Sequence, residues 1–294
     1  MLNYYCILEL EQSFLVGSLT SIGQMYYTKA LKKFLFRVKH TDQYARKCRL
    51  YCVGAAKTGT HSIQAMFNET VRAGHEPNSR SLIKTIIAHE KGLISPEKFT
   101  NYLIKRDAKN CLDVDSSQLN FYLISFLLRQ YDDALFLLTI RDCYSWLDSI
   151  INDTLRRRTS KYWLKMRDLR FERPDSFYSS EESVLKDNRL YTLDGYLAYW
   201  SAHNNTVLSQ VPPTKLMTVK TTEISSHACA IADYSGIPRS ALVIARSHAF
   251  KNPVKYNILR KVDKSFLEAK VQEHCAPLMQ RFFPDVDSAS ILDV

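Results

Sequence analysis

The chain contains 294 residues, a length that suits one large α/β domain or two small ones, and its 46% hydrophobic and 24% charged residues are ordinary for a soluble globular protein. No window of the sequence approaches about eighteen apolar residues, so a membrane-spanning helix is excluded. The formal net charge of +10 favours polyanionic partners, namely phosphorylated cofactors, nucleic acid or an anionic membrane surface.

The cysteine and histidine patterns argue against disulfides and metal sites. Seven cysteines are scattered through the chain without a C-x-x-C pair, and none of the eight histidines shows zinc-ligand spacing near a cysteine. Glu9 and Glu11 interrupt the apolar stretch near the N-terminus, which argues against a secretion signal. These features predict a cytoplasmic protein with reduced thiols and no metal.

Hydrophobic spacing predicts the secondary structure in chain order. Residues 1–46 predict a helical leader packed on the core, and residues 47–294 predict a single domain. Residues 158–190 are polar, basic and weakly periodic, which is typical of an excursion or lid. The expected strands are 50–53, 110–114, 134–140 and 215–219, and the expected helices are 60–74, 79–89, 96–105, 118–131, 144–157, 193–210, 223–234 and 257–282.

The alternation of strands and helices predicts an α/β fold with a mostly parallel central sheet and helices on both of its faces. Ligands of such sheets bind at the carboxyl ends of the strands. Candidate functional residues are therefore expected where the predicted strands end.

A glycine-bracketed loop follows the first predicted strand, with Gly54 and Gly59 at its ends and a helix beginning directly after it. Such a loop directs backbone N–H groups and the positive end of a helix at one point, which predicts an anion site and most often a phosphate site. In a Walker A loop the lysine follows the last glycine, whereas Lys57 precedes Gly59. The loop is therefore not a Walker loop.

A second anion-binding element is expected at the end of the 134–140 strand. Arg141 follows that strand directly, and Ser149 comes eight residues later on the next helix. An arginine can bind a phosphate through a forked pair of N–H donors, and a serine can add a hydroxyl. Two phosphate sites on adjacent strands predict a ligand phosphorylated at two places, namely a bisphosphorylated nucleotide.

The loop and the arginine–serine pair together resemble the PAPS-dependent sulfotransferases, whose donor is 3′-phosphoadenylyl sulfate (PAPS). The resemblance spans residues 49–255 and implies the P-loop-like sulfotransferase architecture. It also implies that PAPS is a co-substrate, that 3′-phosphoadenosine 5′-phosphate (PAP) is a product, and that no metal is required. The matching motifs are Gly54-x-x-Lys57-x-Gly59-Thr60, similar to the family's 5′-phosphosulfate loop, and Arg141 with Ser149, similar to its 3′-phosphate signature.

The resemblance implies roles for individual residues. Lys57 would contact the bridging oxygen of the phosphosulfate, and Arg141 and Ser149 would bind the 3′-phosphate. Lys251 and Asn252 are similar to a late basic loop of the family near that phosphate. The residues that would cradle the 5′-phosphate are Thr58, Gly59, Thr60, His61 and Ser62.

The adenine pocket departs from the family pattern. Cytosolic members keep a tryptophan at the position that Ser62 occupies, so the adenine must stack on another group in this chain. The segment 218–223 falls where those members place residues that line the adenine pocket.

Two acidic residues are candidates for the general base, which transfer to a hydroxyl requires on the acceptor side of the sulfur. Cytosolic members of the family use a histidine near the end of the strand before 134–140, where this chain has Asp115. Other members use a glutamate downstream of the loop lysine, where this chain has Glu76. Asp115 could instead cap the following helix. Together with Asp113, the two acids would suit a cationic acceptor.

The expected function is transfer of a sulfuryl group from PAPS to a hydroxyl or amine of a small-molecule acceptor, such as a natural product. The first alternative is a P-loop kinase that uses ATP, with Asp113 or Asp115 as a magnesium ligand. The second is a non-enzymatic polyanion binder, favoured by basic clusters at 29–49 and 156–173. For the enzyme no nucleic-acid partner is expected, and the oligomeric state is open, with a homodimer as one option.

Overall fold

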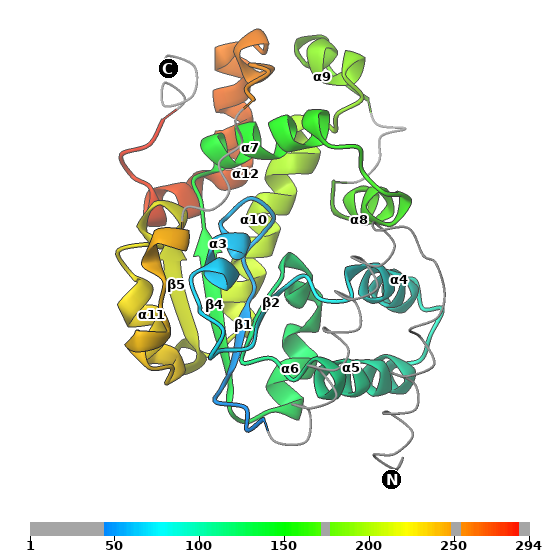
Figure 1. Cartoon of the computed structure of the whole chain (residues 1–294). Coiled ribbons are helices and arrows are strands. Elements are labelled where there is room, and N and C mark those ends of the chain that lie inside the picture. Colours follow the sequence, from blue (N-terminus) through cyan, green and yellow to red (C-terminus); the bar gives the residue numbers. More distant parts are fainter. Residues whose placement is uncertain (1–43, 172–176, 248–253, 288–294) are drawn as a thin grey trace, which may run out of the picture. The chain divides into compact units, whose positions relative to one another are not determined.

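The computed structural model describes residues 44–171, 177–247 and 254–287 (Figure 1). Its contacts divide the chain into two units, 1–45 and 46–294, and the elements below belong to the second unit. The expected leader at 1–46 lies almost entirely outside the described residues, and so do Lys251 and Asn252. No helix in the described ranges combines the length and apolarity that crossing a membrane requires.

Five strands form one sheet in the order β2-β3-β1-β4-β5, and every neighbouring pair is parallel. The interior strand β4, between β1 and β5, is the apolar run Ala134–Ile140, in which only Leu135 is partly exposed. The expected α/β fold with a parallel central sheet is confirmed. The other strands are β1 (Arg49–Cys52), β2 (Ala73–His75), β3 (Val114–Ser116) and β5 (Leu216–Lys220).

Ten α-helices lie in the described part of the chain (Figure 1). They are α3 (Thr60–Ala65), α4 (Ser79–Glu90), α5 (Pro96–Asn110), α6 (Ile124–Gln130), α7 (Cys143–Arg156), α8 (Lys161–Phe171), α9 (Ser183–Asp187), α10 (Leu193–Gln210), α11 (Ala228–Ser235) and α12 (Lys264–Phe282). Short 3₁₀ segments connect several of them.

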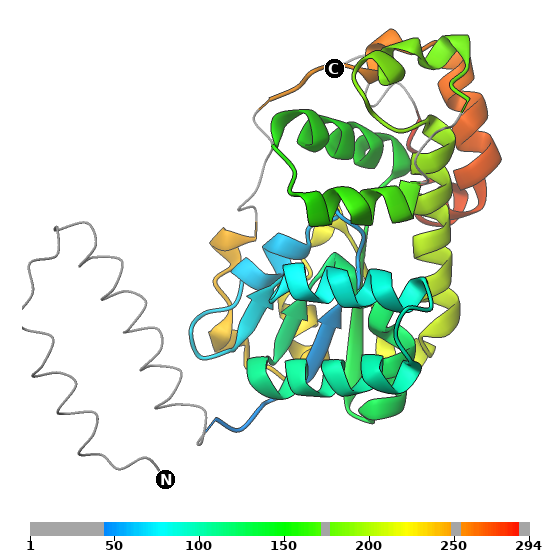
Figure 2. The ribbon, with the colours of Figure 1, turned by 90° about the vertical axis from the view of Figure 1, so that its right-hand side faces the viewer.

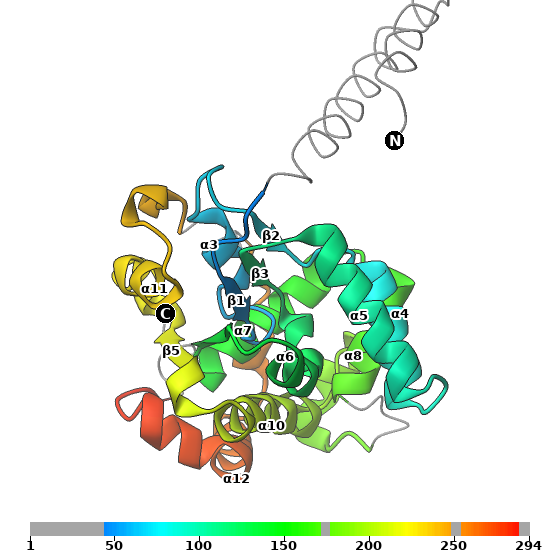
Figure 3. The same ribbon diagram turned by 90° about the horizontal axis from the view of Figure 1, so that it is seen from below.

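The two faces of the sheet bury different sets of helices, because successive side chains of a strand point to opposite faces. Tyr51 and Val53 belong to a core that contains side chains of α4, α5, α6 and α10. Leu50 and Cys52 belong to a core on the other face, formed with α3 and α11. Figure 2 shows α4 and α5 in front of the strands, and Figure 3 shows α11 on the opposite side of the sheet from them.

Several element boundaries differ from the expected ones. The helix expected at 60–74 ends at Ala65, and residues 73–75 form the edge strand β2. Helix α5 continues to Asn110, so the strand expected at 110–114 begins only at Val114. Residues 118–123 are a 3₁₀ segment that precedes α6, since the Ser117 hydroxyl accepts a hydrogen bond from the amide of Leu119. Helix α12 begins at Lys264 instead of 257.

The basic segment 158–190 contains α8 and α9. Helix α8 packs against α4 and α10, which brings this segment to the end of the sheet where β1 and β4 finish (Figure 1). Each of the six cysteines in the described ranges is a free thiol.

Candidate functional site

The loop after β1 is tightly packed against the end of β4. A Cβ atom on Gly54 would lie 2.0 Å from the Thr139 hydroxyl and 2.7 Å from the Thr139 carbonyl oxygen, so only glycine fits there. The Thr58 hydroxyl donates to the carbonyl of Ala55 at 2.8 Å and lies 2.8 Å from the Thr139 hydroxyl. The glycine is therefore required by close approach of the loop to its neighbouring strand.

Three side chains from distant elements hold the carbonyl groups of this loop. Trp146 Nε1 of α7 donates to the carbonyl of Ala56 at 2.8 Å, and His203 Nε2 of α10 donates to that of Val53 at 2.8 Å. The Thr221 hydroxyl, after β5, donates to the carbonyl of Thr58 at 2.7 Å. In a trans peptide the following N–H points the opposite way. The N–H groups of Gly54, Lys57 and Gly59 therefore point away from these three donors, as they must if they are to bind an anion.

The start of α3 is open to an anion. Gly59 caps the helix in a left-handed conformation (φ 99°) and makes no side-chain capping bond. This φ value favours glycine at position 59, whereas the atom nearest to an added Cβ, Ile224 Cδ1 at 2.4 Å, is the movable end of a side chain. The Thr60 hydroxyl lies 3.3 Å from His75 Nε2, and the Ser116 hydroxyl donates to the Thr60 carbonyl at 2.5 Å. The ends of β2 and β3 thereby fix the first turn of α3.

Lys57 lies in the loop with a left-handed backbone (φ 68°). Its ammonium group is 3.3 Å from the carboxylate of Asp153 on α7, and the two side chains are 21% and 12% exposed. Burial lowers the pKa of Lys57, and the charge of Asp153 acts in the opposite direction. The structure thus holds a partly desolvated cation beside the glycine loop.

Arg141 lies directly after β4 and joins the two expected anion elements. Its NH1 group donates to the carbonyl of Lys57 at 3.4 Å, and its Nε donates to the Ser145 hydroxyl at 2.8 Å. Trp200 Nε1 donates to the Arg141 carbonyl at 3.0 Å and holds the backbone there. Within the described residues Arg141 has no ion pair with a carboxylate, and burial lowers its pKa. Ser149 lies one turn beyond Ser145 on the same face of α7.

Residues after 253 return to α7 near Ser149. Lys255 forms an ion pair with Asp148, and the amide of Tyr256 donates to Asn152 Oδ1 at 2.7 Å. These contacts bring the described end of the late basic loop beside the expected 3′-phosphate position. Lys251 and Asn252 themselves fall outside the described residues.

Glu76 follows β2 and is held by a hydrogen-bonded relay. Gln118 Nε2 donates to Glu76 Oε1 at 2.6 Å, and Gln118 Oε1 accepts a hydrogen bond from Arg170 NH1. Burial raises the pKa of Glu76, although the hydrogen bond from Gln118 opposes that change. Nearby, the rings of His61 and His75 stack at 4.4 Å, and burial lowers the pKa of each to about 4. Both imidazoles are therefore neutral at pH 7, and Glu76 is the titratable carboxyl beside them.

The carboxylates of Asp115 and Asp113 both make structural contacts within the fold. The Asp115 carboxylate forms a buried ion pair with Arg106 of α5 at 2.9 Å, and its side chain is 6% exposed. The Asp113 carboxylate accepts hydrogen bonds from the backbone amides of Lys47 at 2.7 Å and Arg72 at 2.9 Å. Asp115 does not cap a helix, because it lies within β3. The support that these acids offered for a cationic acceptor is thereby removed.

Two side chains of the candidate site, Asp153 and Gln118, were not singled out in the sequence. Asp153 could have been found, because Ser145, Ser149 and Asp153 recur every four residues and share one face of α7. Gln118 carries no comparable local signal, because its partners Glu76 and Arg170 come from other elements. Arg157 and Arg170 fall in the basic cluster expected at 156–173, although their partners were not predicted.

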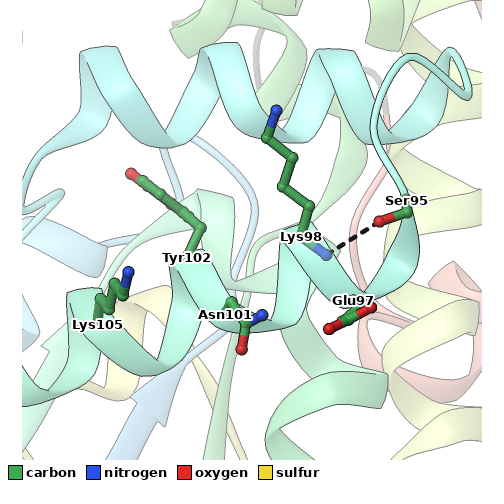
Figure 4. Close-up of a pocket in the computed structure, with 6 residues that line it drawn as sticks. All are labelled: Ser95, Glu97, Lys98, Asn101, Tyr102 and Lys105. Atoms are coloured by element: carbon green, nitrogen blue, oxygen red, sulfur yellow. Dashed lines mark hydrogen bonds between the residues drawn. The ribbon is translucent and has the colours of Figure 1, made fainter.

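A hollow of about 530 Å³ lies elsewhere, along the outer side of α5 (Figure 4). Its lining residues are Ser95, Glu97, Lys98, Asn101, Tyr102 and Lys105. Arg46, just before β1, contacts Asp107 of the same helix, which places α5 beside the starting end of the sheet. This hollow therefore does not belong to the glycine-loop site.

The family model described as "Sulfotransferase domain" matches residues 49–229, from β1 into α11. A crystal structure of a sulfotransferase from Alicyclobacillus acidocaldarius is similar at 13% sequence identity and a TM-score of 0.44, over 85% of this chain and 97% of that chain. None of the curated proteins matches the sequence.

Proposed function

The chain belongs to the sulfotransferase domain family, and from this premise we propose that it transfers a sulfuryl group from PAPS to a hydroxyl or amine of a small-molecule acceptor. The observation that carries the proposal is the contact between the two anion elements, in which Arg141 donates to the carbonyl of Lys57 at 3.4 Å. A nucleotide with a phosphate on each side of its ribose would engage both elements at once.

The donor set fits such a nucleotide. The glycine loop offers backbone N–H groups and an ammonium group for the 5′ side, and Arg141 with Ser149 offers a guanidinium and a hydroxyl for the 3′-phosphate. Arg141 is a partly buried cation whose guanidinium forms no direct ion pair with a carboxylate in the described residues, although the charges of Asp142 and Asp148 act on it from a distance, so a bound phosphate would supply a direct counter-charge. The segment 218–223, next to the loop through Thr221, is our proposed border of the adenine pocket.

The chemistry follows from these groups. PAPS, when bound, supplies the sulfuryl group and a phosphate leaving group. Lys57 and the loop amides stabilise the negative charge that grows on the leaving oxygen, so we propose a reaction that needs no metal. Preorganised donors of this kind act strongly in a site shielded from water, where the dielectric response is low.

Glu76 is the proposed general base. It accepts the proton of the acceptor hydroxyl while the acceptor oxygen bonds to sulfur and the sulfur–oxygen bond to the 5′-phosphate breaks. Burial raises its pKa toward the working range of a base at neutral pH. Asp115 is the weaker candidate, because its carboxylate is already paired with Arg106.

We further propose that residues 47–294 act as one domain and that the 158–190 segment borders the acceptor site. The cytoplasmic location and a homodimer remain predictions from the sequence alone. The kinase alternative loses its magnesium ligands, because Asp113 and Asp115 are engaged by the scaffold.

Titration calorimetry with PAP, AMP and ATP tests the proposal. PAP should bind at least about tenfold more tightly than AMP without Mg²⁺, because one charge-assisted hydrogen bond contributes about 1.5–3 kcal/mol. Arg141→Ala should remove that preference, whereas the exposed Arg239→Ala should keep it. Preference for ATP with Mg²⁺, or PAP and AMP binding equally, would overturn the proposal.

A further inference from the structure

Arg170 is a buried arginine without an ion-pair partner among the described residues. It lies in the last turn of α8 and is 9% exposed, and its NH2 group has no hydrogen-bond partner in the described part of the chain. Its Nε donates to the Tyr122 hydroxyl at 3.3 Å, and its guanidinium lies over the rings of Tyr122 and Tyr199. Its NH1 group donates to Gln118, and the charge of Glu76 reaches it only across that side chain. Burying a cation without a directly paired carboxylate is costly, so this arrangement points to an anion that is supplied from outside.

Three more arginines lie close to one another and share a single carboxylate. The Asp153 carboxylate forms an ion pair with Arg157 Nε at 3.1 Å, and its oxygens lie 3.9 Å from the guanidinium NH2 groups of Arg156 and Arg167. Arg167 lies one turn before Arg170 on α8. We refer to Arg156, Arg157, Arg167 and Arg170 together as the arginine cluster.

The arginine cluster reaches the acceptor side of the proposed site. Gln118 connects Arg170 directly to Glu76, since it accepts from one and donates to the other. Arg157 Nε and the Lys57 ammonium group contact the same carboxylate oxygen of Asp153, at 3.1 and 3.3 Å, so Arg157 lies beside the loop lysine. Its charge also lowers the pKa of His61 and of His75, which burial lowers first.

The charges of this region do not balance. If Lys57 engages the sulfuryl donor, Asp153 and Glu76 are the two carboxylates left facing the four arginines in the interactions above. Asp115 is already paired with the guanidinium of Arg106, and the Asp113 carboxylate is held at the start of the sheet by the backbone amides of Lys47 and Arg72. An anionic ligand group would restore the balance.

We propose that the arginine cluster is a subsite for an anionic group, a carboxylate, sulfate or phosphate ester, carried by the acceptor beside the oxygen that is sulfated. The assignment of this anion to the acceptor rests on the proposed function. The anionic acceptor replaces the cationic one that the sequence led us to expect.

A pair of phenols that differ in charge tests the subsite on the full chain. The probes are 4-hydroxyphenylacetate and its uncharged amide, titrated calorimetrically into protein saturated with PAP. The carboxylate should bind at least about tenfold more tightly, as one charged hydrogen bond predicts. Arg170→Gln and Arg157→Gln should each reduce this ratio to less than about threefold, and the exposed Arg281→Gln should leave it unchanged. Arg157 is 55% exposed at its side chain, so its variant is expected to fold even if Arg170→Gln does not.

Other outcomes overturn the subsite. The subsite is contradicted if the two probes bind equally or if neither binds. It is also contradicted if Arg157→Gln keeps the affinity ratio of carboxylate over amide. The same titrations without PAP separate this failure from failure of the proposed function. A carboxylate preference that PAP abolishes would assign the arginines to the nucleotide and overturn the acceptor subsite. If PAP itself does not bind, the proposed function fails. The assignment of the subsite to the acceptor then fails too, even if the protein still prefers the carboxylate probe over the amide.

Discussion

The ammonium group of Lys57 lies 3.3 Å from the carboxylate of Asp153, a residue 96 positions later in the chain. Asp153 also forms an ion pair with Arg157 at 3.1 Å, so the Asp153 carboxylate keeps a partner when the Lys57 ammonium group binds a ligand anion. The ion pair between Lys57 and Asp153 therefore orients the loop lysine and favours its charged form, and a ligand anion can replace it. Burial lowers the pKa of Lys57, and the charge of Asp153 opposes that change and so favours the ammonium form.

Asp153→Asn should shift the pH dependence of catalysis. Burial already lowers the pKa of Lys57 and Asp153 raises it, so removing the carboxylate lowers that pKa further. The charged form is then lost at lower pH, and the alkaline limb of kcat/KM for PAPS should move to lower pH. Asp233→Asn, which removes an exposed partner of Arg239, is the control and should leave the limb in place. An unchanged alkaline limb in Asp153→Asn would contradict the role of the pair.

Glu76→Gln and Asp115→Asn should separate the two candidate bases. Glu76→Gln should lower kcat by about 10²–10⁴-fold and leave the midpoint of thermal unfolding nearly unchanged. Burial raises the pKa of Glu76, so the acid limb of the wild-type kcat profile should lie above the ordinary range of a glutamate.

Asp115→Asn should instead reduce stability. It leaves the buried Arg106 without its carboxylate, which typically costs about 3–5 kcal/mol of unfolding free energy. Activity of the fraction that stays folded should be retained. If Asp115→Asn loses the acid limb while Glu76→Gln keeps it, the base is Asp115.

His203 should make the protein less stable in acid. Burial lowers its pKa to about 3, whereas the unfolded chain has an ordinary histidine. The unfolded state therefore binds the proton first, and stability is lost as the pH falls from about 6.5 toward 3. Between pH 8 and 4.5 this one group should contribute roughly 3 kcal/mol of the loss in unfolding free energy.

Urea unfolding of wild type and His203→Gln at both pH values measures this contribution. His61 and His75 titrate in both proteins, so the difference between the two pH dependences isolates His203. Two proteins with the same pH dependence would show that folding does not lower the pKa of His203.

Gly54→Ala and Gly92→Ala distinguish crowding from backbone strain. A Cβ atom at Gly54 would lie 2.7 Å from the backbone carbonyl oxygen of Thr139, so β4 or the loop must move. We expect a loss of about 3 kcal/mol or more in the free energy of unfolding. Gly92 has φ 66° and nothing within 4 Å, so its alanine variant should lose about 1–2 kcal/mol from strain alone. Urea unfolding checks both, and equal losses would refute the close packing of the loop.

The fold was predictable where the signal lies within one element. The apolar run 134–140 and the helix 193–210 were expected with the bounds that the structure has, because a seven-residue run with a single polar member and a threonine cap are local features. The edge strand β2 was missed, since a three-residue strand containing Gly74 has little intrinsic preference for that conformation. Its existence depends on pairing with β3.

For the site, glycine spacing and strand ends are enough to predict the loop, Lys57 and Arg141 as candidates, because neighbouring residues along a strand and turn form these features. The tertiary structure decided which charges are available. Arg106 pairs Asp115 while Arg170 keeps no carboxylate partner in the described residues, and neither outcome can be read from sequence spacing. The pKa of an ionisable side chain depends on burial and on charges a few ångströms away, and those neighbours come from elements that only folding brings together.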